Sequence, residues 1–403
     1  MSKLIAPLAV FGAVLVAMVA LNGGATSPPA LSADAPPKTA ATYSKRASDL
    51  LTRARETGDA SLYAAAERAV TAALHRDPGD VGALIGAATL AGLRHDFRGQ
   101  LRYGLRAQRS EPALASPLTV ITDAQLELGR YGAAAHTAQR LVDWKPGLPA
   151  YARVSYYREL TGDPAGAARA MRFAASAGGS PQSSAYVRAL LGDLELAQGH
   201  AGAARAAYRD ALRDVPSFPQ ALTGLARVNA ARGALDEAAA LLRGSTRRLP
   251  LTTSLTLLGE TELAAGHPLE ARRGLAAARE KHAADIASGG LPDAEAVLFE
   301  ANHGSPARAV RLGRSVFGRA PSIRSADALG WALTRAGRPA AGYRWTRRAL
   351  RTGSRDPLFA LHAGVAALRS GRPDEARRHL AAALTGAAAL SPASARLLRE
   401  ALA

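Results

Sequence analysis

A glycine recurs every 33 to 38 residues along most of this 403-residue chain, and this register restricts the fold more than any other feature. Each glycine separates two segments with helical apolar spacing, where a left-handed backbone can end the first helix. The best-formed copy runs from Leu191 to Pro216, and Pro216 closes it because proline lacks an amide donor. The sequence therefore predicts a series of helical hairpins. The eight glycines in register are Gly129, Gly162, Gly199, Gly233, Gly266, Gly304, Gly337 and Gly371.

Small residues occupy two further places in each copy, where the two helix backbones would cross. A larger side chain at either place would push the hairpin apart. Only 5% of the residues are aromatic, so apolar burial depends on Ala and Leu, which favours helices. Five residues after the glycine stand Ala134, Ala167, Ala204, Ala238, Ala271, Ala309, Gly342 and Ala376. Seven residues before it stand Thr122, Ser155, Gly192, Ala226, Gly259, Val297, Gly330 and Gly364.

The spacing is longer at two places and weaker near the start of the chain. The two longest intervals contain SAGGSPQSS and ASGGLPD, which predict loop insertions between units. Before Gly129, the pattern of Ala66, Val70, Ala73 and Pro78 still matches the second helix of a hairpin. About ten units are expected in all.

This pattern resembles the tetratricopeptide repeat, a 34-residue helix-turn-helix unit, from about residue 43 to residue 403. The resemblance implies an all-α, right-handed superhelical solenoid of about ten such units. Residues 43–113 are expected to form degenerate units, and residues 114–390 the regular array. Residues 391–403 are expected to form a helix that covers the apolar end of the stack.

The N-terminus carries a targeting signal. An uncharged apolar run from Leu4 to Leu21 follows Lys3, so residues 1–21 are predicted to be a signal peptide or an N-terminal transmembrane anchor. Cleavage after Ala25 or Ala33 and retention both stay open. Residues 22–42 are Pro- and Ala-rich and predict a flexible linker. The repeats of an exported or membrane-anchored protein of bacterial type would then lie on the extracytoplasmic side.

In the family that this chain resembles, the first helices line the concave surface. A mixed, centrally acidic wall of polar and aromatic side chains there would suit an extended peptide. The resemblance therefore implies a scaffold that binds a protein or peptide partner on this face, without specifying the partner or an oligomeric state. The alternative is that these residues only keep the wall hydrated. The candidate residues are Asp123, Tyr156, Glu159, Tyr186, Asp193, Arg227, Glu260 and Trp331.

Basic residues give a second hypothesis, in which the chain binds an anionic membrane or polymer surface. The formal net charge is +18, and arginines cluster on or just after the predicted second helices, which form the convex side. A solvated arginine-rich face without a partner also explains them. The clusters are Arg102, Arg106 and Arg109; Arg247 and Arg248; Arg272 and Arg273; Arg344, Arg347, Arg348 and Arg351; and Arg377 and Arg378.

The sequence contains none of the common motifs of a catalytic, nucleotide-binding or metal site. The chain has no cysteine, its nine histidines form no HExxH pattern, and neither GxxxxGK nor GxSxG is present. The sequence predicts no enzyme, no cofactor and no metal. Nucleic acid is disfavoured as a partner because, although the charge would fit, the export signal opposes it.

Overall fold

The computed structural model of the chain describes residues 39–403. The predicted signal peptide or anchor, at 1–21, and most of the predicted linker lie outside the described residues. The first helix begins at Ala40, so the last three residues of the predicted 22–42 linker are helical. The hydroxyl of Thr39 caps this helix by accepting a hydrogen bond from the amide of Thr42. None of the helices within 39–403 combines the length and apolar character that a bilayer crossing needs.

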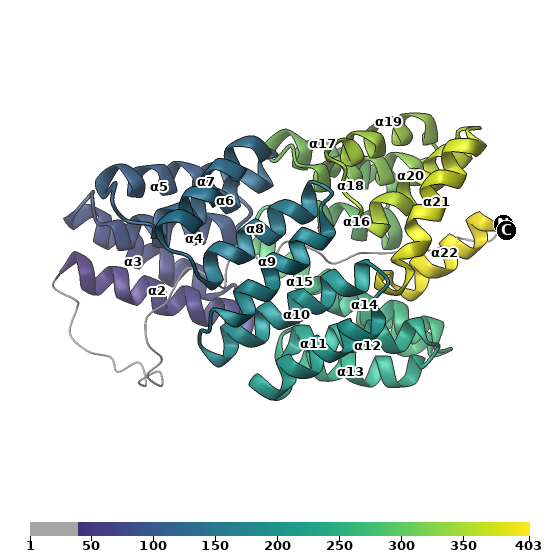
Figure 1. Cartoon of the computed structure of the whole chain (residues 1–403), viewed down its shortest axis with the longest axis horizontal. Helices are drawn as coiled ribbons and strands as arrows, with labels where there is room; N and C mark the ends of the chain where they lie inside the picture. The colour runs from purple at the N-terminus through teal and green to yellow at the C-terminus, as the bar shows by residue number, and fades with distance from the viewer. Residues whose placement is uncertain (1–38) are drawn as a thin grey trace.

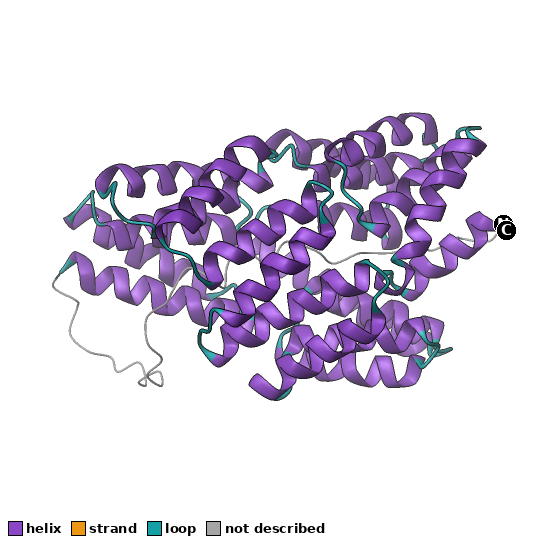
Figure 2. Cartoon of the chain, viewed as in Figure 1, coloured by secondary structure: helices purple, strands orange, loops and turns teal. Residues whose placement is uncertain are grey.

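The described residues are helical throughout, with no strand among them (Figure 2). The expected all-α solenoid is confirmed: ten antiparallel hairpins, numbered here as units 1 to 10, stack in chain order (Figure 1). The units are α2 (Ala40–Thr57) with α3 (Leu62–Arg76), α4 (Val81–Leu93) with α5 (Phe97–Ser110), α6 (Ser116–Glu127) with α7 (Tyr131–Trp144), α8 (Leu148–Leu160) with α9 (Pro164–Ser176), α10 (Pro181–Ala197) with α11 (Ala201–Asp214), α12 (Pro219–Ala231) with α13 (Leu235–Arg248), α14 (Thr252–Ala264) with α15 (Pro268–Ala287), α16 (Ala294–His303) with α17 (Pro306–Arg319), α18 (Ile323–Arg335) with α19 (Pro339–Ala349), and α20 (Pro357–Arg369) with α21 (Pro373–Thr385). Short 3-10 helices η1 (Leu350–Thr352) and η2 (Ala387–Ala389) follow units 9 and 10, and α22 (Pro392–Leu402) ends the chain.

The turns inside the hairpins follow the predicted register, with one exception. Seven of the eight aligned glycines have positive φ, but Gly304 has φ −128° because α16 ends differently. Unit 1 turns at Gly58, and unit 2 turns at His95, which takes φ +60° without being glycine. The glycine pattern therefore misses unit 2, although its backbone makes the same turn.

The predicted small positions are all buried between paired helices. Their effect is clearest around Tyr208 in α11, whose ring lies between Gly192 of α10 and Gly224 of α12. A β-carbon added at either glycine would come closer than 3.0 Å to this ring. The two glycines thus allow one buried tyrosine to fill the space between two first helices.

The two longer spacings were predicted to be loop insertions, and this is right only in part: ASGGLPD lies almost wholly in a loop, whereas the last four residues of SAGGSPQSS begin α10. Helix α10 has 17 residues and α15 has 20, whereas most helices have 13 or 14. Only four residues separate α9 from α10, and six separate α15 from α16. The extra residues therefore mainly lengthen helices.

The solenoid closes on itself along a line of contacts called here the seam. The turn of each of units 1 to 5 meets the loop that follows the unit five places further along the chain. Leu291 donates its amide to the carbonyl of Arg94 at 2.9 Å, and Ile323 donates its amide to the hydroxyl of Tyr131 at 2.9 Å. The hydroxyl of Thr352 donates to the carbonyl of Leu160 at 2.6 Å. In Figure 1, helices α4 to α7 accordingly lie beside α16 to α18.

The last helix belongs to this closure. Helix α22 packs against α20 and α21 of unit 10 and also against α14 of unit 7. Leu397 and Leu398 are buried in these contacts. The helix expected at 391–403 therefore covers the end of the stack and also ties it to an earlier unit.

Replacement of Gly162 by alanine tests the seam. Gly162 and Gly233 have nearly equal φ, +85° and +83°, so alanine costs each site about 1–2 kcal/mol of backbone strain. A β-carbon at Gly162 would also come closer than 3.0 Å to the carbonyl of Gly353, whereas one at Gly233 has no neighbour within 4 Å. We expect Gly162→Ala to lower the free energy of unfolding by roughly 1–3 kcal/mol more than Gly233→Ala. The measurement is urea unfolding followed by circular dichroism, and equal losses would contradict the closed seam.

Candidate functional site

All eight candidate peptide-binding residues lie on first helices, as the register requires. Six of them are buried, whereas Glu159 and Asp193 are half-buried. Their positions are Asp123 in α6, Tyr156 and Glu159 in α8, Tyr186 and Asp193 in α10, Arg227 in α12, Glu260 in α14 and Trp331 in α18. Peptide binding by these residues stays a prediction, and in the closed solenoid most of them have little contact with solvent.

Instead, most of these side chains form hydrogen bonds with residues of a neighbouring first helix. The guanidinium of Arg153 donates to the carboxylate of Asp123 at 2.6 Å inside the protein. The hydroxyl of Tyr156 donates to Glu127 at 2.8 Å. Each bond joins one unit to the next, so the inner surface is a ladder of side-chain pairs.

The ladder continues through the C-terminal units. The imidazole of His303 lies 2.8 Å from the carboxylate of Glu260. The indole of Trp331 donates to Asn302 at 2.8 Å and stacks on the ring of His362, which lies 2.7 Å from Asp327. The partners Glu127, Arg153, Asn302, His303, Asp327 and His362 were not identified from the sequence. A signal that could have identified them is a carboxylate on one first helix and a hydrogen-bond donor about 29 to 43 residues away on another.

Three carboxyl groups on the inner surface have raised pKa values. Burial raises the pKa of Asp123 to about 6 despite Arg153, and raises that of Asp193 to about 6 despite Arg227. Burial and the nearby carboxyl of Asp356 raise the pKa of Glu159 to about 8, although Arg324 opposes them. Near pH 7 Glu159 is therefore mostly neutral, whereas Asp123 and Asp193 are mostly ionised.

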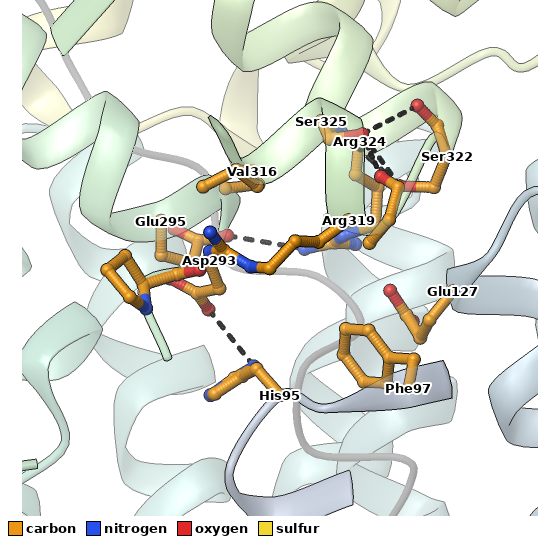
Figure 3. A pocket seen from close by; sticks show the side chains of 13 residues that line it. His95, Phe97, Glu127, Asp293, Glu295, Val316, Arg319, Ser322, Arg324 and Ser325 are labelled. Atoms are coloured by element: carbon orange, nitrogen blue, oxygen red, sulfur yellow. Dashed lines mark hydrogen bonds and ion pairs between the residues drawn. The ribbon is translucent and has the colours of Figure 1, made fainter. Parts of the chain in front are cut away.

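A polar pocket lies where the seam joins unit 2 to units 8 and 9 (Figure 3). It encloses about 530 Å³, including solvent at its mouth. His95 faces Asp293 across it at 3.7 Å, and Arg324 pairs with Glu295 at 3.2 Å. Glu127 closes one side. Arg319 donates to the carbonyl of Pro292 at 2.7 Å, and Glu127 accepts from Tyr156, so the ionic groups lining this pocket already have partners. They come from units 2 and 3 on one side of the seam and from units 8 and 9 on the other.

The outer surface carries two features that the inner surface lacks. Phe173 on α9 is 60% exposed and Trp144 on α7 is 48% exposed. The arginine clusters predicted for the outside are exposed on or just after the second helices. No group of three or more His, Cys, Asp or Glu within 39–403 could hold a metal ion.

Comparison with known proteins agrees with this architecture. Residues 189–250 match the model of the tetratricopeptide repeat family. This span includes the hairpin from Leu191 to Pro216 and the unit that follows it. A search of curated proteins found no match.

Solved structures with the same kind of fold are distant in sequence. A human IFIT1 dimer with PPP-AAAA is 15% identical, with 79% of this chain and 73% of that chain covered and a TM-score of 0.51. The human IFIT1 dimer with m7Gppp-AAAA gives 14% identity, coverages of 79% and 72%, and a TM-score of 0.51. The APC/C hetero-tetramer Cut9–Hcn1 gives 16% identity and a TM-score of 0.38, with 84% of this chain covered, and this chain spans 59% of that chain's length. The likeness to IFIT1 shows the all-α solenoid fold alone.

Neutralisation of Glu159 tests the acidic interior. Its folded-state pKa of about 8 lies above the ordinary 4.5, so its contribution to stability is complete below about pH 4.5 and is lost as the pH rises through 8. We expect Glu159→Gln to match the natural chain near pH 4.5 and to exceed its free energy of unfolding by roughly 1–3 kcal/mol near pH 8.5. Urea unfolding at both pH values measures this difference. Glu280→Gln, at an exposed carboxyl on α15, is the control, and a similar gain there would contradict the burial argument.

Proposed function

We propose that this chain is a noncatalytic scaffold that binds partner proteins. The hairpin array supports this role because stacked repeats present long, rigid surfaces to other chains. The single observation that carries the proposal is the exposure of large aromatic side chains on the outer helices.

These outer aromatic residues are Trp144 on α7 and Phe173 on α9, and the partly buried Tyr151 of α8 lies beside Phe173. The ring of Phe173 lies 5.7 Å from the ring of Tyr151, and the guanidinium of Arg140 lies 5.1 Å from the ring of Trp144. Trp, Tyr and Arg dominate the binding energy of protein interfaces, and a large exposed aromatic ring gains from burial by a partner. Arg169 and Arg172 are exposed on the same helix as Phe173. The favoured partner surface is therefore apolar at its centre and acidic at its edge.

Peptide binding on the inner wall is the second mode to consider, as the sequence predicts. In the closed solenoid, Asp123, Arg227 and Trp331 already have partners inside the protein. A peptide could reach them only if the seam opened and some of these bonds broke. The outer aromatic residues need no such change, so we place the working surface there.

Nucleic acid is a weaker candidate for the interior. Human IFIT1 has been solved with PPP-AAAA, but the likeness to this chain concerns the fold. The buried cations Arg153, Arg227 and Arg324 here each pair with a carboxylate. The phosphate groups of a nucleic acid would therefore meet arginines that are already neutralised, next to carboxylates that repel them, and this opposes their entry.

A proposal for the cellular location rests on the N-terminal sequence alone. The apolar run from Leu4 to Leu21 supports export or membrane attachment, with the solenoid on the extracytoplasmic side. We propose that the scaffold meets its partners there.

Photo-crosslinking from the outer aromatic residues tests the proposed function. A photoreactive phenylalanine analogue replaces Phe173 in the full chain, and the matched control places it at Arg232, which is exposed in the turn after α12. We expect a defined protein adduct from position 173 in intact cells and none from position 232. Trp144→Ala, which removes a second exposed ring, should reduce the yield several-fold, because hot-spot residues act together.

The inner-wall mode gives a different result in a variant with the seam locked. The chain has no cysteine, so Arg94→Cys with Leu291→Cys offers a single disulfide across backbones that are already hydrogen-bonded at 2.9 Å. Adducts that persist in the oxidised form support the outer surface. Adducts that vanish on oxidation and return on reduction would overturn it in favour of the inner wall.

A further inference from the structure

Two neighbouring second helices, α17 and α19, carry basic residues and no acidic residue. Helix α17 contains four arginines over Pro306–Arg319, and α19 contains three over Pro339–Ala349. Arg351 follows directly in η1. We call the exposed members of this set other than Arg308 the basic face: Arg311, Arg314, Arg344, Arg347, Arg348 and Arg351.

The charges of the basic face are not neutralised by ion pairs within residues 39–403. Only Arg308, at the start of α17, is paired, with Glu300. On α11 the situation is different, because Arg213 pairs with Asp210 at 2.5 Å and Asp214 pairs with Arg188 at 2.7 Å. Unpaired positive charge is therefore more concentrated on these two neighbouring helices than on α11.

Two aromatic rings pack between α17 and α19 beneath the basic face and are only partly accessible to solvent. The rings of Phe317 on α17 and Trp345 on α19 meet edge to face, with centroids 4.7 Å apart. The guanidinium carbon of Arg348 lies 4.8 Å from the first ring and 5.5 Å from the second. Both rings are partly buried. They are thus poor platforms for stacking bases, which single-stranded nucleic acid would need.

The seam extends the surface along the molecule. Arg98, at the start of α5, donates to the carbonyl of Gly318 near the end of α17 at 2.8 Å. Helix α5 also lacks acidic residues over Phe97–Ser110. Acid-free helices from distant parts of the sequence therefore meet end to end.

We propose that the basic face docks on an anionic phospholipid bilayer. A broad array of unpaired guanidinium groups without an open stacking site matches a dense layer of headgroup phosphates. The apolar run at 4–21, predicted from the sequence to attach the chain to a membrane, would keep this face close to such a surface. This proposal goes beyond protein binding and uses different residues from it.

The test uses the full chain with one fluorophore, because an N-terminal apolar segment could itself bind any vesicle. Ser315→Cys places the label on the exposed side of α17, and Ala203→Cys places the control label on α11. Vesicles contain a quencher lipid in either phosphatidylglycerol or phosphatidylcholine. We expect quenching at position 315 only with phosphatidylglycerol, weakened by added salt, and little quenching at position 203.

Charge reversal supplies the matched variants. Arg314→Glu with Arg344→Glu should weaken the phosphatidylglycerol-dependent quenching at least about tenfold in lipid concentration, since each basic residue near the surface contributes about fivefold. Arg209→Glu with Arg232→Glu makes the same change in net charge on α11 and α12 and should have a much smaller effect. Equal effects of the two pairs, or equal quenching with phosphatidylcholine, would overturn the proposal. Single-stranded RNA that displaces the vesicles and binds more tightly to the natural chain would replace it with nucleic-acid binding.

Discussion

The glycine turns of units 1, 3, 4 and 5 come so close to the loop after the unit five places later that a side chain has little or no room between them. At Gly129, Gly162 and Gly199 the nearest group across the seam is a backbone carbonyl. This close approach closes the solenoid, and closure then determines the environment of the inner surface. The side-chain ladder is buried because the seam shuts, and the raised pKa values of its carboxyl groups follow from that burial.

The hairpins could be predicted from the sequence because their determinants are local. A glycine, a small residue five places later and a small residue seven places earlier are enough to set each turn and each helix crossing. The pattern failed where another solution serves the same backbone: His95 takes the left-handed turn of unit 2, and Gly304 lies in a turn that needs no positive φ. Four residues predicted to lie in a loop, at 181–184, instead begin α10, and α15 is long because it continues up to the predicted loop at 288–293.

The seam and the ladder could not be predicted in the same way. Thr352 meets Leu160 at a separation of 192 residues, and Arg98 meets Gly318 at a separation of 220. Such contacts depend on the small rotation between successive units, which no single repeat encodes. Asp123, Tyr156 and Trp331 were correctly assigned to first helices, but whether that wall is open or closed is a property of the whole array. The residues that we propose for binding therefore lie on the outer helices: Phe173 on α9 and the arginines of α17 and α19.

The seam also changes how such an array should lose its structure. In an open solenoid each repeat contacts only its neighbours, so end repeats can fray while the middle stays folded. Here units 1 to 5 each also contact the end of the unit five places later, and α22 packs on α14 as well as on unit 10. Each of these units is therefore held both by its neighbours in the stack and by a unit across the seam. Amide protons near both ends of the array should consequently exchange almost as slowly as those at its centre, through one shared opening.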